Sequence, residues 1–227
     1  MLSENRYKIR MIDSVLYDPW SPSGPTPSPE TVAHGLANLC RYGGHVTRRY
    51  SVAEHSIWVA LHLACNGADN DAFRTAANAI AAGNAKEAFY VTPPDRARLA
   101  LCGLVHDAPE GCGLVDVPGP IGRHEEMREY QNAHERCIKW LCDGWGISGY
   151  AECYDQVKAV DIAILGAELA IRPVGAMGHD GSGEDIPPWS GLDLAIEHDL
   201  SLYGHKYIHG AWVAAYRTLG KLMRGEK

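Results

Sequence analysis

The chain has 227 residues, 46% of them hydrophobic, which is enough to bury the core of one ordinary domain. Its formal net charge of −7 argues against nonspecific binding of nucleic acid, because such binding depends on lysine and arginine facing phosphates. No stretch is long and apolar enough to span a membrane, and the N-terminus lacks the apolar run of a secretory signal, so we expect a cytoplasmic protein without a membrane partner.

The first 29 residues predict an irregular N-terminal arm. Five prolines, several serines and a glycine lie within residues 18–29, and this composition continues neither a helix nor a central strand. Helical signals begin after Ser28, where Pro29 suits a first helical turn. Hydrophobic residues then recur at helical spacing until the segment stops at Gly43 and Gly44. We therefore expect a single domain over residues 30–227.

A second helix is predicted from residue 51 to about residue 64. Ser51 is its expected N-cap, and Glu54 three positions later completes a capping box, which places His55 in the first turn. The alanine-rich residues 72–88 predict another helix, broken near Gly83.

The remaining segments are also predicted to be helical, apart from one loop. A helix that starts at residues 92–95 is expected to carry His106 and Asp107 and to end at Gly111 to Gly113. Further helices are predicted over residues 123–141, 150–171 and 195–222, the last interrupted around Gly204, with a loop at about 173–194. Because no segment shows the sustained alternation of a sheet, the pattern predicts an all-α domain.

The seven cysteines are scattered in mostly apolar settings, and no Cys-x-x-Cys pair occurs. They are typical of reduced core residues, and a structural zinc site built on thiolates is not expected.

The adjacent His106 and Asp107 are the most informative residues. An imidazole and a carboxylate on consecutive residues of an apolar segment offer two metal ligands, although such a pair alone commonly lies at a solvated helix end. A second imidazole upstream, His55, and a carboxylate downstream, Asp161, favour the metal interpretation. Since one helix face can rarely surround an ion, ligands from three segments are what a helical protein requires.

The four predicted ligands, His55, His106, Asp107 and Asp161, suit one divalent ion. Two imidazoles with two carboxylates are compatible with Mn²⁺, Co²⁺, Mg²⁺, Fe²⁺ or Zn²⁺, and the sequence does not choose among them. Helix capping by His55 and a solvated position for Asp161 are the alternatives. Asp161 stands in an apolar stretch, however, where an unpartnered carboxylate would be costly to bury.

Glu110 is the candidate general base, or the residue that orients the attacking water. It follows Asp107 by three positions, so on a helix it projects near the metal without having to coordinate it. The other histidines, His134 among them, fall in charged or loop settings and show no matching partners in the sequence.

Four segments occur in the order found in a known family. They are Cys40-Arg-Tyr-Gly-Gly-His45, Ser51-Val-Ala-Glu-His-Ser56, His106-Asp107-Ala-Pro-Glu110 with Asp116 and Pro118, and Val157-Lys-Ala-Val-Asp161 with Glu168. From about Glu30 to about Arg172 the chain resembles the HD-domain phosphohydrolases, particularly the branch related to bacterial 5′-deoxynucleotidases and phage dATP triphosphohydrolases. The resemblance implies an HD-domain helical bundle and a homo-oligomer.

The resemblance also implies roles for further residues. Asp116 is expected to be the second catalytic carboxylate, which shares the water or helps to protonate the leaving oxygen. It lies one residue further from the His-Asp pair than in most relatives, which indicates an insertion within residues 111–115. Arg41 and Tyr42 resemble an arginine-aromatic pair used against the substrate, in which arginine forks onto phosphate and the ring stacks on base or sugar. A packed helix end is the alternative for this pair. Lys158, one turn before Asp161, would reach phosphate or a carboxylate.

The sequence therefore predicts a metal-dependent phosphohydrolase whose partner is a small-molecule deoxynucleotide. It does not settle whether phosphate leaves a monophosphate or triphosphate leaves a dNTP. Hydrolysis of cyclic or stringent-response nucleotides is a further enzymatic alternative, without the Gly-Tyr-Pro motif of the cyclic-dinucleotide branch. A metal- and nucleotide-binding regulator and a purely structural helical domain are the non-enzymatic alternatives.

Overall fold

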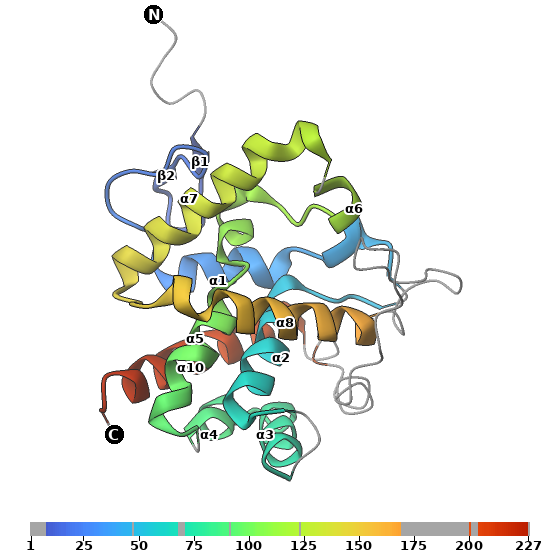
Figure 1. Ribbon diagram of the computed structural model, residues 1–227, viewed down its shortest axis with the longest axis vertical. Coiled ribbons are helices and arrows are strands. Elements are labelled where there is room, and N and C mark those ends of the chain that lie inside the picture. The colour runs from blue at the N-terminus through green and yellow to red at the C-terminus, as the bar shows by residue number, and fades with distance from the viewer. Residues whose placement is uncertain are drawn as a thin grey trace, which may run out of the picture.

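A computed structural model describes residues 8–46, 48–67, 71–90, 92–122, 124–168, 200 and 204–226 (Figure 1). These residues are predominantly helical, with a single two-stranded sheet among them, so the all-α prediction is confirmed. The predicted loop at 173–194 and the beginning of the last predicted helix lie outside the described residues.

The elements follow one another along the chain as a series of helices joined by short connections. The strands are β1 (Ile9–Arg10) and β2 (Leu16–Tyr17). The α-helices are α1 (Pro29–Asn38), α2 (Val52–Cys65), α3 (Asp71–Ala81), α4 (Ala85–Tyr90), α5 (Pro94–Val105), α6 (Gly119–Gly122), α7 (Arg128–Trp145), α8 (Tyr150–Glu168) and α10 (Gly204–Met223). Short helical turns of other types are η1 (Arg41–Gly44), η2 (Glu110–Leu114) and η3 (Glu125–Met127).

Helix α2 lies at the centre of the core. It is hydrophobic around its whole circumference, as expected of a helix packed on all sides, and it contacts α1, α5, α8 and α10 (Figure 1). Trp58 and Leu61 of α2 and Leu101 of α5 are among the largest fully buried side chains. The same burial applies to the polar residues at the start of α2, so His55 is held in the interior with no exposed surface.

The predicted helix starts are confirmed by their capping hydrogen bonds. The Ser28 side chain accepts from the amide of Thr31 at the start of α1, and the Ser51 side chain accepts from the amide of Glu54 at the start of α2. These bonds satisfy amides that the helix itself leaves without acceptors, and they fix the rotation at which α2 presents His55.

The N-terminal arm contains more order than the sequence predicted. Strands β1 and β2 pair antiparallel, with Ile9 opposite Tyr17, whereas residues 18–28 form neither helix nor strand, as expected. The arm lies along α7, where the Trp140 indole donates to the Gly24 carbonyl at 3.0 Å and the Trp145 indole to the Pro27 carbonyl at 2.9 Å.

The first helix ends earlier than predicted. We expected it to stop at the two glycines 43 and 44, but α1 ends at Asn38. The chain then pairs with the segment before α2, because the Arg41 amide donates to the Tyr50 carbonyl and the Val52 amide to the Leu39 carbonyl. This pairing replaces the helical hydrogen bonds and brings η1 beside the start of α2.

The helix expected to carry the His-Asp pair also ends early. Helix α5 stops at Val105, so His106 and Asp107 lie in the turn that follows it. Pro109 accounts for this break, since proline has no amide to donate to the carbonyl of Val105 and its ring crowds the preceding turn. The chain continues into η2, a π-helical turn.

None of the described helices combines the length and the apolar character needed to cross a membrane.

Candidate metal centre

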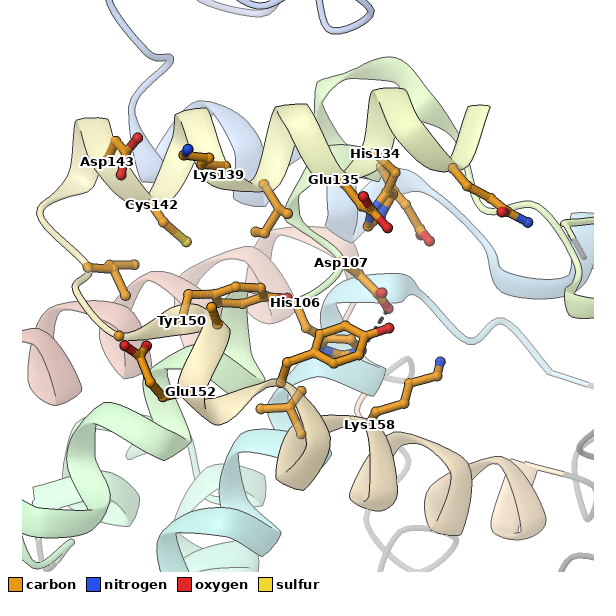
Figure 2. A pocket seen from close by; sticks show the side chains of 18 of the residues that line it. His106, Asp107, His134, Glu135, Lys139, Cys142, Asp143, Tyr150, Glu152 and Lys158 are labelled. Atoms are coloured by element: carbon orange, nitrogen blue, oxygen red, sulfur yellow. Dashed lines mark ion pairs between the residues drawn. The ribbon is translucent and has the colours of Figure 1, made fainter. Parts of the chain in front are cut away.

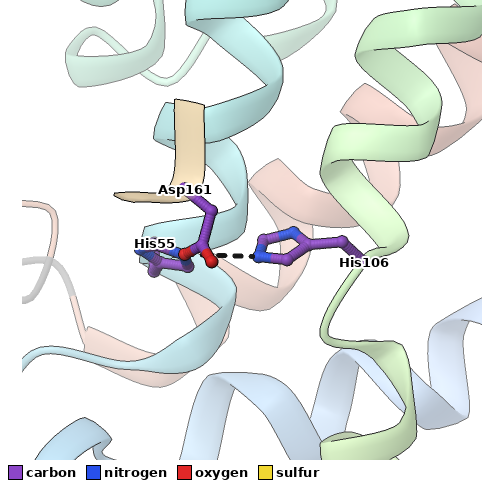
Figure 3. A group of neighbouring side chains, drawn as sticks. All are labelled: His55, His106 and Asp161. Carbon is purple, nitrogen blue, oxygen red and sulfur yellow. Dashed lines mark hydrogen bonds and ion pairs between the residues drawn. The ribbon is translucent and has the colours of Figure 1, made fainter. Parts of the chain in front are cut away.

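The four predicted ligands converge on one point. His55 comes from α2, Asp161 from α8, and His106 and Asp107 from the turn that follows α5. His55 Nε2 lies 3.1 Å from Asp161 Oδ1, and His106 Nε2 lies 3.2 Å from Asp107 Oδ2. The cross distances are 3.8 Å from His55 Nε2 to Asp107 Oδ2 and 3.9 Å from His106 Nε2 to Asp161 Oδ1. Figure 3 shows His55, His106 and Asp161 pointing toward one another.

In each imidazole, Nδ1 donates a hydrogen bond that fixes the orientation of the ring. His106 Nδ1 donates to the Gly103 carbonyl at 2.7 Å, and His55 Nδ1 donates to Glu168 Oε1 at 2.5 Å. In a neutral imidazole this leaves the Nε2 lone pair facing the two aspartates. Metal-ligating histidines characteristically have such a second hydrogen bond to a carbonyl or carboxylate, which fixes the tautomer and the orientation of the ring.

The charges at this point are strongly coupled. Burial by itself lowers the pKa of His106, but Asp107 and Asp161 overcome it and raise that pKa to about 10. Burial raises the pKa of Asp161, but the nearby imidazoles of His106 and His55 bring that pKa well below the usual value. The pocket therefore stabilises two carboxylate anions and positive charge between them.

The residues present fit a divalent cation. His106 Nε2 is buried and has no hydrogen-bond partner in the described part of the chain. His55, His106 and Asp161 each offer one donor atom, all within 4.8 Å of one another, and Asp107 lies beside both imidazoles. Two nitrogen and two oxygen donors suit the borderline and hard divalent ions. The structure does not identify the ion.

Glu168 completes the site behind His55. The sequence indicated it only through the family resemblance, and in the structure its buried carboxylate contacts His55, Arg41 and the hydroxyl of Tyr42. Burial would raise the pKa of Glu168, but Arg41 and His55 lower it to about 2. Glu168 is therefore an ionised carboxylate that orients the His55 ring.

Glu168→Gln is expected to weaken metal binding by about 10- to 100-fold, the usual effect of losing an outer hydrogen-bond partner of a ligating histidine. An amide can still accept one hydrogen bond, but it carries no charge against the His55 ring. Calorimetric titration of metal-free protein with Mn²⁺ measures the change. Asp155→Asn, at an exposed position of the same helix, is the matched control and should bind metal normally. Equal affinity in the two variants would remove Glu168 from the site.

Arg41 and Tyr42, predicted to bind substrate, lie behind the metal ligands. The buried Arg41 guanidinium lies 3.3 Å from Asp107 Oδ2 and 3.3 Å from Glu168 Oε2. Tyr42 adopts the left-handed backbone conformation, with φ of 58°, and its hydroxyl donates to Glu168. These contacts favour a role in holding the ligands, and the substrate role of the pair stays a prediction.

Asp116 lies beside the site in spite of the additional residue before it. The turn η2 is π-helical, and its hydrogen bonds span one residue more than those of an α-helix, whereas the insertion inferred within residues 111–115 stays a prediction. Asp116 Oδ2 then accepts from the Tyr42 amide at 2.7 Å. Burial raises the pKa of Asp116, although Arg41 acts in the opposite direction.

Glu110 and His134 form a second group of possible donors with Asp107. The three donor atoms lie within 4.8 Å of one another. Glu110 Oε2 is buried and has no hydrogen-bond partner among the described residues. Burial and the neighbouring carboxylates of Asp107 and Asp116 raise the pKa of Glu110 well above its usual value. Glu110, which the sequence predicted as the general base, therefore lies beside Asp107, as its spacing of three residues indicated.

His134 is a site residue that the sequence interpretation missed. It comes from α7, and burial lowers its pKa, which favours the neutral imidazole. Tyr130, His134 and Ile138 follow one another at intervals of four, so they share one face of α7, and all three line the same cavity. That spacing is the signal that could have marked His134.

Lys158 lies one turn before Asp161 on α8, as predicted. Its Nζ lies 2.5 Å from Asp161 Oδ2, and the side chain is 52% exposed. It therefore contacts a metal ligand on one side and remains accessible to an anion on the other.

The described elements thus form a helical protein with a candidate divalent-metal centre opening on a cavity of about 950 Å³ lined in part by His106, Asp107 and Glu110. Comparison with protein-family models and with curated proteins finds no match for this chain.

Proposed function

We propose that this protein is a divalent-metal-dependent phosphohydrolase of the HD-domain type that acts on deoxynucleotides. The observation that carries the proposal is the convergence of His55, His106, Asp107 and Asp161 next to a cavity that His106 and Asp107 line. Glu110 lies beside Asp107, and its Oε2 has no hydrogen-bond partner among the described residues. The order of the motifs, which resembles that of the 5′-deoxynucleotidase branch, supports the choice of substrate.

A divalent ion held by these four residues would activate water and polarise a phosphoryl oxygen. We propose that Glu110 orients the attacking water or accepts its proton, because its side chain lines the cavity together with Asp107 and its buried Oε2 has no hydrogen-bond partner among the described residues. Lys158 is accessible beside Asp161 and would contact a phosphate oxygen. Arg41 holds Asp107 in place from the opposite side.

The overall reaction is hydrolysis of a phosphate ester. Water adds to phosphorus, the bond from phosphorus to the leaving oxygen breaks, and the leaving oxygen takes up a proton. Asp116, whose pKa is raised by burial, lies near Glu110, as Asp107 does. We propose that Asp116 takes part with Glu110 in transferring these protons. For a deoxynucleoside monophosphate the products are a deoxynucleoside and inorganic phosphate.

The activity is tested with a panel of deoxynucleoside mono-, di- and triphosphates in the presence of Mn²⁺, Co²⁺, Mg²⁺ or Zn²⁺. Phosphate, pyrophosphate and triphosphate are measured separately, since the product identifies the bond that is cut. Release of phosphate from a monophosphate is the expected result, and release of triphosphate from a dNTP would identify a triphosphohydrolase instead. No turnover with any substrate and metal would contradict the proposal and favour a binding protein.

The metal requirement is tested independently of turnover. Metal-free protein should melt at a higher temperature when Mn²⁺ or Co²⁺ is added, because a ligand that binds the folded state stabilises it. If no divalent ion is retained on purification and none raises the melting temperature, the metal site itself is disproved.

A further inference from the structure

The cavity next to the metal centre runs between α7 and α8 (Figure 2). Asp107 and Lys158 lie at one end of it, and Asp143 and Glu152 lie at the other. Its volume of about 950 Å³ falls within the range of small-molecule sites, and it extends well beyond the space that one phosphate needs. The cavity thus has room for the organic part of a substrate between the Asp107 end and the Asp143 end.

The walls of the cavity combine an apolar floor with aromatic rings. Ile138 and Val157 are buried beneath it, one from each helix. Three tyrosines, Tyr130, Tyr150 and Tyr154, also line it. Phenol rings offer flat faces for stacking on a base, with a hydroxyl that remains hydrated.

The ring of Tyr130 is fixed by hydrogen bonds, whereas the ring of Tyr154 is exposed to solvent. The Tyr130 hydroxyl donates to the carbonyl oxygens of Leu114 and Val115, so this ring is held in place. Tyr154 is 53% exposed on the first turns of α8. An exposed aromatic ring at the border of an apolar cavity can close over a bound molecule at small cost to the fold.

The charged side chains of the cavity indicate how many phosphates it receives. Lys158 is the cation near the metal ligands, and Lys139 is the other lysine in the described lining. Besides Asp107 and Glu110, three further carboxylates line the cavity, namely Glu135, Asp143 and Glu152. This balance suits one phosphate beside Lys158 followed by an uncharged group, whereas a triphosphate extending along the cavity would meet uncompensated negative charge.

We propose that the cavity between α7 and α8 binds the nucleoside part of a deoxynucleoside monophosphate, with Tyr154 stacked on the base. The phosphate lies at the Asp107 and Lys158 end, and the base lies over the apolar floor toward Asp143. This assignment rests on the proposed function for the position of the phosphate. It makes Tyr154 a specificity residue and assigns a monophosphate, not a triphosphate, to the site.

The test measures binding in a protein that does not turn substrate over. Glu110→Gln protein loaded with Mn²⁺ is titrated with each of the four common deoxynucleoside monophosphates, with the corresponding triphosphates, and with 2-deoxyribose 5-phosphate, which has no base. Free Mn²⁺ is kept constant because triphosphates chelate it. We expect at least one monophosphate to bind more tightly than its triphosphate.

Tyr154→Ala, introduced into the same protein, should weaken binding of that monophosphate by about tenfold, since stacking on one ring contributes about 1–3 kcal/mol. Binding of 2-deoxyribose 5-phosphate should change less than about twofold, and Tyr154→Phe should restore nucleotide binding because it keeps the ring. Tyr90→Ala is the matched control, since Tyr90 is a similarly exposed tyrosine outside the cavity lining. The substitution at an exposed position leaves folding intact, which circular dichroism verifies.

The outcomes separate this proposal from the proposed function. Equal loss with and without the base, an unchanged Tyr154→Ala protein, or tighter binding of the triphosphate would overturn the cavity assignment even if the wild type hydrolyses nucleotides. Nucleotide binding that depends on Tyr154 in a protein whose wild type releases no phosphate would support the cavity assignment and contradict the hydrolytic function.

Discussion

Asp107→Ala is expected to abolish both metal binding and hydrolysis. Asp107 Oδ2 faces the Nε2 atoms of His106 and His55, and the carboxylate is also the partner of the buried Arg41. Its removal takes one oxygen donor from the ion and leaves the guanidinium cation without one of its two counter-charges. Because the metal supplies several kcal/mol of transition-state stabilisation, activity should fall by about 10³-fold or more.

Metal content by mass spectrometry and phosphate release measure the two effects of Asp107→Ala. Asp155→Ala removes an exposed carboxylate from α8 and serves as the control, with metal and activity unchanged. Circular dichroism establishes that both proteins are folded. An Asp107→Ala protein that retains its metal and more than about a tenth of its activity would exclude Asp107 as a ligand.

Glu110→Ala is expected to keep the metal and to lose turnover. Glu110 lies outside the group of donors formed by His55, His106 and Asp161, and its side chain lines the cavity together with Asp107. Loss of a general base usually lowers the rate by about 10²- to 10⁴-fold. Rate and bound metal are measured on the same preparation, and Glu110→Gln, which keeps the shape of the side chain, should behave in the same way.

The opposite result for Glu110 would have a definite meaning. Glu110, Asp107 and His134 also form a group of possible donors, so loss of metal in both Glu110 variants would show that this carboxylate is a ligand. A near-normal rate in either variant would remove Glu110 from the mechanism.

Local signals in the sequence were sufficient to predict the helices that position the site. The predicted N-cap Ser51 marks the start of α2, and the break near Gly83 separates α3 from α4 as expected. The convergence of His55, His106 and Asp161 was also predicted, because an unpartnered carboxylate in the apolar stretch of Asp161 is costly to bury and the order of the motifs resembles that of a known family.

Features that depend on packing between distant segments could not be predicted in this way. His134 approaches Asp107 because α7 packs against the turn η2, and its spacing with Tyr130 and Ile138 marks a shared face of α7 but names no partner on another segment. Arg41 was assigned to substrate from the family resemblance, whereas its burial against Asp107 and Glu168 follows from the pairing of its segment with the residues before α2. The early end of α5 follows from Pro109, a local signal that the prediction of a continuous helix did not use.

The π-helical turn η2 has a consequence for how the length of this chain can vary. An added or deleted residue in an ordinary helix rotates everything that follows by about 100° around the axis. Here the wide turn is anchored by close backbone packing, since a Cβ on Gly111 would lie 2.6 Å from the Val32 carbonyl. The change in length is therefore confined between His106-Asp107 on one side and Asp116 on the other. We therefore expect that a residue added to or deleted from this turn would shift Asp116 and leave the four predicted metal ligands in place.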